Sequence, residues 1–415
     1  MNLSLNKKLL VIINKIRYEP ALLLAIPHGL IIAIILVLIS PIKKIRVGFL
    51  NSTRIGHFTE NTENYLLEKK YLDIKNKKSI DLFYFSGEIC NITLAKLWNR
   101  KLIILPYFIL RSACLIIRSV KFLNNYSCSI NLNPRDVNNL YDKTHPNLEF
   151  THEEILRGEQ ELKKLGIDKG EKFICLIVRD SSYLKSIYKK ENLPDISQHN
   201  FRDCNINNFC LAAEELTKKG FFVIRMGAVV KSPFPYINDK IIDYAYSGVR
   251  TDFMDIFLGA NCEFCISTGT GFDGIPNIFR KPVLYVNMIP FGAIRVSSMT
   301  HLNITKHVYS INENKNLSIN DMIECNMLTS QKKDEYIEKN LRLIENTSEE
   351  VKDAALEMLD RVNYRFKLDK NDQDLHNKFW SIFPTSIVYK NLRLHGEIRG
   401  NIANEFLKKN EYLIK

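Results

Sequence analysis

A glycine-bearing loop with two threonines offers the clearest candidate chemistry in this chain. Gly269-Thr270-Gly271-Phe272-Asp273-Gly274 has the spacing G-x-G-x-x-G and follows an apolar strand expected over residues 263–267. A dinucleotide fingerprint would open the first strand–helix unit of its domain, with an acidic residue about 20 positions later. Pro276 breaks the following helix, and residues 281–310 contain no Asp or Glu. The dinucleotide interpretation is therefore weak, which leaves a phosphate cradle or a plain turn.

Residues at neighbouring strand ends favour the phosphate cradle. Arg179 and Arg225 end two further apolar strands, expected over residues 172–179 and 221–225. Because parallel strands finish at one edge of a sheet, the two cations should converge beside the Gly/Thr loop. Guanidinium groups, hydroxyl groups and backbone amides together suit a pyrophosphate. The alternative, a tight turn with two surface arginines, stays open.

The elements that position these residues alternate between strands and helices along the chain. Near-continuous apolar strands between helices indicate parallel sheets covered on both faces. Thr251 is expected to cap a helix over residues 252–260, and Thr347-Ser-Glu-Glu350 has capping-box spacing. We predict an α/β fold with two Rossmann-like domains, arranged as a membrane-associated segment (1–42), an N-terminal domain (43–168), a C-terminal domain (169–312) and a helical tail (313–415).

Charge and cysteine usage narrow the class of protein. The formal net charge is +12, which suits nucleic acid, an anionic membrane face or a phosphate-bearing substrate. No basic stripe with interleaved aromatic residues supports nucleic acid. Nine cysteines without framework spacing indicate a reducing compartment. Cys262 and Cys265 lie three apart on an expected strand and face opposite sides, so we interpret them as core thiols.

Two apolar stretches indicate contact with lipid. Residues 21–40 read ALLLAIPHGLIIAIILVLIS, and the triplet Pro27-His28-Gly29 is expected to interrupt a helix. Basic residues flank this tract on both sides, which fits a re-entrant or interfacial hairpin at least as well as one crossing, with a buried core helix as the second interpretation. Residues 102–117 contain Arg111 and could form a basic, apolar groove for a lipid-linked phosphate or an ordinary core helix.

Several short motifs follow one another in a fixed order along the chain. They are Arg54-Ile-Gly-His57, Asn91, His199-Asn-Phe-Arg202, Val223-Ile-Arg-Met-Gly227, Asp255-Ile-Phe-Leu258, Ser267-Thr-Gly-Thr-Gly271 and Asn287. In their order and spacing, over about residues 45 to 310, the chain resembles a family of glycosyltransferases from bacterial surface-polysaccharide gene clusters. More remotely, the layout is similar to that of two-domain nucleotide-sugar transferases of the GT-B type, such as heptosyltransferases and fucosyltransferases.

The resemblance implies a nucleotide-sugar donor on the second domain and an acceptor on the first, with residues 395–415 packing back toward the first domain. The acceptor would be a lipid-linked or surface glycan of capsule, O-antigen or lipopolysaccharide synthesis, met at the cytoplasmic face of the bacterial inner membrane through residues 20–42. We expect acceptor binding by Arg54, Asn91 and Arg111, and donor binding by Arg179, His199, Arg202, Arg225, Gly227, Ser267, Thr268, Gly269, Thr270 and Gly271.

His57 is the expected general base, because it follows Gly56 at a strand–helix turn, and a helix-capping or phosphate-contacting histidine is the alternative that stays open. Glu60 is the first reserve, followed by Glu63 and Asp180. No metal or other cofactor is expected. Cations can neutralise the leaving diphosphate, and Asp372-Gln-Asp374, the one Asp-x-Asp sequence, falls in a polar run that reads as a solvated loop. Two alternatives stay open: a nucleotide-sugar epimerase of the same fold, and a basic, membrane-bound scaffold without enzyme activity.

Overall fold

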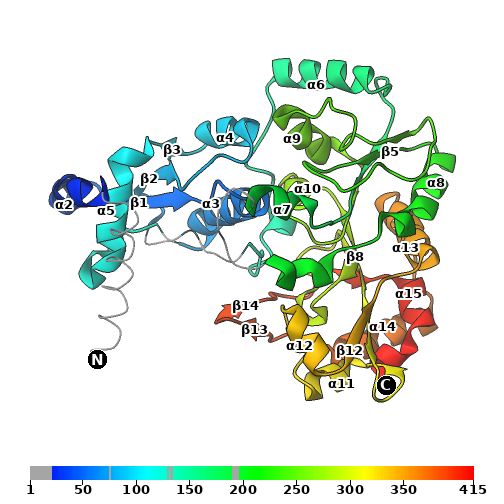
Figure 1. Ribbon diagram of the computed structural model, residues 1–415. Coiled ribbons are helices and arrows are strands. Elements are labelled where there is room, and N and C mark those ends of the chain that lie inside the picture. The colour runs from blue at the N-terminus through cyan, green and yellow to red at the C-terminus, as the bar shows by residue number, and fades with distance from the viewer. Residues whose placement is uncertain (1–20, 74–75, 129, 131–133, 189–195) are drawn as a thin grey trace. The chain divides into compact units, whose positions relative to one another are not determined.

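The computed structural model describes residues 21–73, 76–128, 130, 134–188 and 196–415, and the chain divides into two compact units. Unit 1 ends at Pro134 and unit 2 begins at Arg135. Each unit has a parallel sheet with helices packed on it (Figure 1). The fold is therefore mixed α/β, as the alternation of apolar strands and helices predicts. Residues 1–20 of the predicted membrane-associated segment lie outside the described residues.

Unit 1 is built on a three-stranded parallel sheet in the order β1–β2–β3. After β3 the chain returns to the edge of β1 that does not pair with β2. There the Cys128 N–H donates to the Val47 carbonyl at 2.9 Å. The elements are α2 (Ala21–Ile39), β1 (Ile45–Leu50), the π-helical turn η1 (His57–Asn61), α3 (Thr62–Tyr71), β2 (Ile80–Phe85), α4 (Ile92–Asn99), β3 (Ile103–Ile104), α5 (Tyr107–Ser119) and η3 (Lys121–Tyr126).

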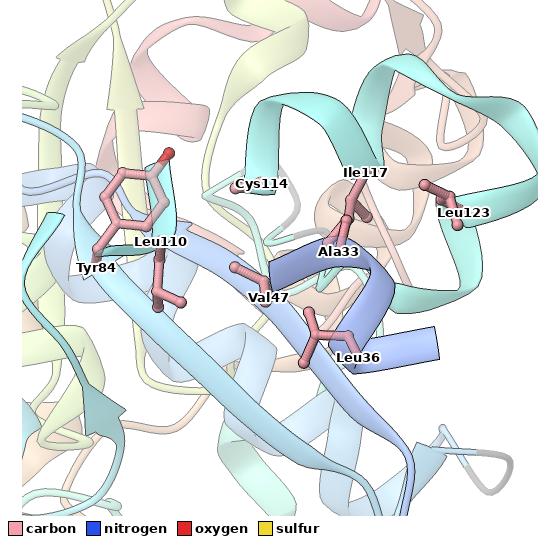
Figure 2. Close-up of a cluster of buried hydrophobic side chains, with 8 residues drawn as sticks. All are labelled: Ala33, Leu36, Val47, Tyr84, Leu110, Cys114, Ile117 and Leu123. Carbon is pink, nitrogen blue, oxygen red and sulfur yellow. The ribbon is translucent and has the colours of Figure 1, made fainter. Parts of the chain in front are cut away.

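Side chains that alternate along β1 and β2 form two cores, one on each face of this sheet. On one face, Tyr65 of α3 packs edge-on against Phe83 with ring centroids 5.2 Å apart. On the other face, side chains of α2, α5 and η3 close over the sheet (Figure 2). The helix α2 is therefore part of the folded unit. The buried cluster consists of Ala33, Leu36, Val47, Tyr84, Leu110, Cys114, Ile117 and Leu123.

The helix α2 corrects one expectation, because it runs unbroken from Ala21 to Ile39 with Pro27 inside it. A Cβ on Gly29 would lie 2.8 Å from atoms of Ser112, so α2 crosses α5 closely at this glycine. Packing against α5 stabilises a helical conformation of Pro27-His28-Gly29, which these three residues do not favour by themselves. Among the helices with described placement, none combines the length and apolar character needed to cross a membrane.

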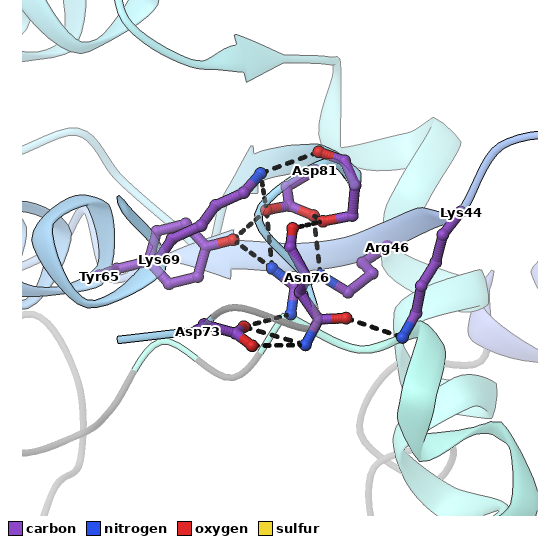
Figure 3. Close-up of polar contacts among 8 residues, drawn as sticks. Lys44, Arg46, Tyr65, Lys69, Asp73, Asn76 and Asp81 are labelled. Carbon is purple, nitrogen blue, oxygen red and sulfur yellow. Dashed lines mark hydrogen bonds and ion pairs between the residues drawn. The ribbon is translucent and has the colours of Figure 1, made fainter. Parts of the chain in front are cut away.

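A buried ion-pair network ties β1, β2 and α3 together (Figure 3). Nε and Nη2 of Arg46 each donate to a different oxygen of Asp81 at 2.8 Å. The Tyr65 hydroxyl and the Lys69 ammonium contact the same carboxylate. Burial by itself would raise the pKa of Asp81, but these donors outweigh it and hold that pKa well below its usual range. Asp81 is therefore ionised in the folded chain at neutral pH.

Unit 2 contains a seven-stranded parallel sheet in the order β15–β9–β8–β7–β4–β5–β6. The chain starts at β4, moves outward to β6, and then returns to build β7, β8 and β9 on the other side, which is doubly wound topology. The strands of this sheet are β4 (Phe173–Ile177), β5 (Phe222–Arg225), β6 (Ile241–Ile242), β7 (Cys265–Ser267), β8 (Val283–Met288), β9 (His301–Thr305) and β15 (Asn401–Ile402).

Helices and smaller sheets surround this seven-stranded sheet. The helices are α6 (His152–Lys164), α7 (Ser182–Tyr188), α8 (Cys210–Lys218), α9 (Asp252–Asn261), α10 (Gly274–Ile278), α11 (Ile319–Glu324), α12 (Lys333–Glu338), α13 (Ser348–Val362), α14 (Lys370–Ile382) and α15 (Asn404–Lys409), with short turns η4 (Tyr141–Lys143), η5 (Ile196–Arg202), η6 (Ile206–Phe209), η7 (Phe291–Ala293) and η8 (Glu411–Ile414). The strands β10 (His307–Ser310), β11 (Lys315–Asn316) and β12 (Leu341–Ile344) form one small sheet, and β13 (Val388–Tyr389) pairs with β14 (Leu392–Arg393).

Unit 2 extends beyond the predicted second domain at both ends. At the start, α6 packs on α9, where a Cβ on Gly158 would lie 2.1 Å from the Phe257 ring. At the end, β15 pairs with β9, and α13 packs on α8. The division after Pro134 thus lies upstream of the boundary expected near residue 168. The return of residues 395–415 toward the first domain stays a prediction.

We predict that Asp81→Asn destabilises unit 1 by ~3–5 kcal/mol, because it leaves the Arg46 guanidinium buried without its carboxylate. Urea unfolding, followed by the fluorescence of buried Trp98 in a Trp380→Phe background, measures this change. Since the pKa of Asp81 is depressed in the folded chain, its contribution should be present above about pH 4 and decline as pH falls further.

The matched control is Asp73→Asn, because the Asp73 side chain is 35% exposed and its ion pair with Arg46 spans 3.3 Å. Its cost should stay within about 1 kcal/mol. Equal losses for the two variants would contradict the assignment of the Arg46–Asp81 pair as the centre of the network.

Candidate functional site

The carboxyl ends of β4 and β7 lie where the strand order of unit 2 reverses. Helices that follow such strands leave toward opposite faces of the sheet, and ligands bind in the crevice between them. The backbone N–H of Arg179 donates to Oγ1 of Thr268 at 2.8 Å, and the N–H of Thr268 donates to the Ile177 carbonyl at 3.2 Å. The structure therefore brings Arg179 and the Gly/Thr loop to one edge of the sheet.

The Gly/Thr loop is folded by its own hydroxyl groups. Oγ of Ser267 accepts from the N–H groups of Gly269 at 3.1 Å and Thr270 at 3.5 Å. Gly269 has φ +71, and a Cβ there would lie 3.1 Å from Sδ of Met288, so this position requires glycine. The free amides expected of a phosphate cradle are thus partly used within the loop, while Gly271 lies beyond the pocket lining. What the loop offers a ligand is its Thr268–Gly269 corner.

A pocket within unit 2 opens at this corner. Among its described lining residues four are basic and none is acidic. Such a surface attracts a ligand with several anionic oxygens, as a diphosphate has. The structure brings together His199, Arg202, Thr268 and Gly269 of the predicted donor set. The complete lining is Arg135, His199, Phe201, Arg202, Thr268, Gly269, Asn287, Met288, Ile289, Pro290, Ala293, Arg295 and Gln331.

Two buried histidines report the positive field around the pocket. Burial, followed by the charges of Arg295 and Arg135, lowers the pKa of His301 to about 3. Burial and the same two arginines lower the pKa of His395 to about 4. Both imidazoles are therefore neutral at pH 7, and the Nε2–H of His395 donates to the Gly292 carbonyl at 2.8 Å. Besides burial, the two lowered pKa values therefore reflect the positive charges of Arg135 and Arg295.

Arg135 and Arg295 are functional candidates that sequence reasoning missed. Nη1 of Arg135 donates to the Ile294 carbonyl at 3.1 Å and Nη2 donates to the Ala293 carbonyl, so its guanidinium holds the wall formed by η7. Neither arginine ends a strand or belongs to a motif. The sequence did contain one indication of the role of Arg295. Residues 281–310 have no Asp or Glu, which argues against a carboxylate that binds a ribose and also predicts a basic surface.

Asn287 contributes a buried polar group to the pocket lining. It is 2% exposed and has φ +56 at the end of β8. Its backbone N–H and Oδ1 exchange hydrogen bonds with Asn346 at 2.9 and 2.6 Å, which fixes the side chain. Nδ2 of Asn287 has no hydrogen-bond partner of normal geometry among the described residues, and the side chain it faces is the Cys204 thiol, a weak acceptor. An amide nitrogen held this way is a donor prepared for a ligand oxygen.

The other two predicted donor arginines are paired with carboxylates and do not line the pocket. Arg179 pairs with Asp203 at 3.3 Å, and burial lowers its pKa. Arg225 is 3% exposed; its Nη1 donates to the Ser232 carbonyl at 2.6 Å and pairs with Asp243 at 3.2 Å. A Cβ on Gly227 would lie 2.7 Å from Val230, so Arg225 and Gly227 organise the loop that follows β5.

Unit 1 has its own reversal of strand order, at β1, and His57 follows the carboxyl end of that strand. The helix after β1 begins with the π-helical turn η1, and such turns occur frequently at functional sites. Nδ1 of the half-buried His57 lies 3.1 Å from Oδ1 of Asn61. Because that oxygen can only accept, Nδ1 is the donor of this contact, which leaves Nε2 as the ring nitrogen available to a reacting group.

The remaining predicted residues of unit 1 are spread around this turn. Glu60 is 3% exposed on η1, and Arg54 is exposed just before it. Asn91 is fully buried, and its Oδ1 accepts from the Leu94 N–H at 2.8 Å as the N-cap of α4. Arg111 is half-buried on α5. Helix capping thus accounts for Asn91 without a ligand.

The chain as described contains no cluster of three or more His, Cys, Asp or Glu side chains that could hold a metal ion. Asp372-Gln-Asp374 corrects another expectation, because it lies within α14, with Asp372 in the first turn, rather than in a loop. The Asp372 carboxylate accepts from Nδ2 of Asn404 and from Lys408, each at 2.8 Å. These donors anchor α14 to α15.

Comparisons with known proteins yield weak structural overlaps only. No protein-family model matches the chain, and no curated protein matches it. The solved structure of ADP-heptose lipopolysaccharide heptosyltransferase II from E. coli overlaps 59% of this chain and 86% of its own at 9% identity, with a TM-score of 0.37. A glycosyl transferase family 9 structure from Veillonella parvula overlaps 59% and 80% at 10% identity, with a TM-score of 0.35. Since both scores lie below 0.5, the overlaps do not establish a common fold.

We predict that Arg202→Gln combined with Arg295→Gln weakens binding of inorganic pyrophosphate by about 100-fold or more, because each lost charge-assisted hydrogen bond contributes ~1.5–3 kcal/mol. Isothermal titration calorimetry in the presence of EDTA measures this change. Arg225→Gln is the matched control, since its guanidinium faces Asp243 and Ser232: it should lower the melting temperature and leave affinity unchanged. A double variant that binds as tightly as the unaltered chain would exclude the pocket as the anion site.

Proposed function

We propose that this protein is a glycosyltransferase that moves a sugar from a nucleotide-sugar donor to a lipid-linked or surface-glycan acceptor. One observation carries the proposal: the pocket at the ends of β7 and β8 combines three arginines and a histidine, with no carboxylate among its described lining residues. A departing nucleoside diphosphate carries its charge on phosphate oxygens, which guanidinium groups bind in a bidentate manner. Cations already directed at that charge stabilise the transition state without reorganisation.

In the proposed donor site, Arg202, Arg295 and His199 bind the diphosphate oxygens. Nδ2 of Asn287 and the Thr268–Gly269 corner complete the set of donors. The same cations would take the role that a divalent ion has in metal-dependent transferases. We therefore propose a reaction without metal and without any other cofactor.

For the acceptor, we propose binding by unit 1 with His57 as general base and Glu60 in reserve. Nε2 of His57 would take the proton of the attacking hydroxyl group, while the Nδ1–H of the same ring stays hydrogen-bonded to Oδ1 of Asn61. Arg54 and Arg111 would bind an anionic part of the acceptor. Asn91 would act through the position of α4, which it caps. The support is the location of His57 at the carboxyl end of β1.

The sequence resemblance supports the setting that we propose for this reaction. The acceptor would belong to a bacterial capsule, O-antigen or lipopolysaccharide and would be carried on lipid at the cytoplasmic face of the inner membrane. Residues 20–42 would attach the protein there, and α2 exposes apolar side chains over most of its described length. The nucleotide-sugar and the membrane-borne glycan would be the two partners.

The proposal is tested in two stages with purified protein. Thermal stabilisation by UDP, GDP, ADP or CMP in EDTA would support a metal-free donor site, and the nucleotide that stabilises most names the donor. Labelled donor is then incubated with bacterial lipid extract. Label in the lipid fraction supports a transferase. Label that stays on the nucleotide with a changed sugar would establish the epimerase instead, and no stabilisation by any nucleotide would overturn both.

We predict that His57→Gln lowers kcat for sugar transfer by roughly 10²–10⁴-fold, the usual contribution of a general base. Thermal stabilisation by the nucleotide should stay unchanged, since the proposed donor site lies in unit 2. His152→Gln, an exposed histidine on α6, is the matched control and should have full activity. Unchanged kcat in His57→Gln would remove this residue from the mechanism.

A further inference from the structure

The outward side of α2 is apolar although it faces solvent. One side of the helix, with Ala33 and Leu36 4% and 5% exposed, packs in the core of unit 1. On the remaining sides Ile31, Ile34 and Leu38 are 58%, 57% and 71% exposed. A helix on the surface of a globular protein normally has polar side chains there. Between residues 25 and 39 of α2, the sequence contains a single polar side chain, that of His28.

The exposed apolar surface continues past the end of α2. Ile42 is 89% exposed, and Phe122 of η3 is 78% exposed. Phe122 precedes Leu123, which packs in the same cluster as Leu36 (Figure 2). We call the exposed side of α2 together with Ile42 and Phe122 the apolar surface of unit 1. Contiguous apolar patches of this kind mark contact with a membrane or another protein.

Charge decides between those two kinds of partner. The exposed Lys43 and Lys121 stand beside Ile42 and Phe122, and Arg118 is exposed on α5 with its guanidinium 5.0 Å from the Phe49 ring centroid. Residues 21–59 and 89–135, which include α2, α5 and η3, contain no Asp or Glu. An apolar face bordered by cations and free of acidic residues complements an anionic lipid surface.

We propose that unit 1 docks on an anionic membrane with α2 lying in the plane of the interface. The outward side chains of α2 would enter the boundary between headgroups and acyl chains, and Lys43 and Lys121 would contact lipid phosphates. The buried side of α2 argues for this orientation. A helix drawn across the bilayer would leave Val47 and Ile117 without Ala33 and Leu36, which cover them in the folded unit.

This inference deepens the proposed function, because a transferase held on the membrane surface meets a lipid-linked acceptor at its headgroup. It rests on that function only for its biological setting. The test uses the full-length chain and lipid vesicles without donor or acceptor, so its failure would leave the proposed sugar transfer untouched.

The first experiment is cosedimentation with vesicles of phosphatidylcholine, with and without phosphatidylglycerol. We expect binding to the anionic vesicles, and Ile34→Glu with Leu38→Glu should weaken it at least tenfold. Ile237→Glu is the matched control, because Ile237 is 96% exposed in unit 2 and should have no effect. Lys43→Gln should weaken binding about fivefold on anionic vesicles only, as expected for one lysine at such a surface.

The melting temperature of the Ile34→Glu, Leu38→Glu variant should equal that of the unaltered chain, since both side chains face away from the core. The second experiment measures depth with Leu30→Trp and Leu38→Trp and lipids brominated at different acyl positions. An in-plane helix gives both positions the same shallow depth, whereas a crossing helix gives them different depths. Different depths would overturn the proposed orientation.

Absence of vesicle binding by the unaltered chain would overturn the proposal. So would a dimer in solution that Ile34→Glu with Leu38→Glu converts to a monomer without any vesicle binding, since the apolar surface would then be an interface between two copies. Loss of vesicle binding in this variant, with binding retained in Ile237→Glu, supports it.

Discussion

The reversal of strand order in unit 2 is the constraint on which the candidate site depends. Between β4 and β7 the helices leave toward opposite faces, so the ends of these two strands are covered by neither. The hydrogen bond from the Arg179 N–H to Thr268 Oγ1 joins the two ends and fixes the corner from which the pocket opens. Every residue proposed to bind the donor is placed relative to that corner, from the loop itself, from β8 and η5, or, for Arg295, from the segment after η7.

Six arginines of this protein fall into two groups according to the side chains that surround them. Arg46, Arg179 and Arg225 each stand against a carboxylate, and the pairing offsets the cost of burying their charge. Arg135, Arg202 and Arg295 line a pocket whose described residues include no carboxylate. A phosphate ligand in the pocket would face the three arginines of the second group directly, whereas it would have to displace an aspartate to reach those of the first. This difference, rather than position at a strand end, identifies the arginines suited to binding.

The sequence predicted the frame of unit 2 closely. Apolar runs located β4, β5, β7 and β8, and the caps at Thr251 and Thr347 were read correctly because capping depends on residues three positions apart. The site was predicted only in part. The partner of Arg225 is Asp243, and the partner of Asn287 is Asn346, which lies 59 positions away. Such pairings come from tertiary packing and leave no local pattern. Pro27 within α2 shows the same effect, because contact with α5 decides its conformation.

The π-helical turn of unit 1 has a consequence for where His57 points. Such a turn inserts one residue into the helix, which shifts the residues before it by about 100° relative to those after it. His57 therefore points about one residue position around the helix axis away from the direction that an uninterrupted α-helix would give it. Trp98 on α4 holds the insertion in place, since its Nε1 donates to the Phe58 carbonyl at 3.0 Å. The direction of the histidine side chain thus depends on the indole of Trp98, which lies forty positions after the Phe58 carbonyl that it binds.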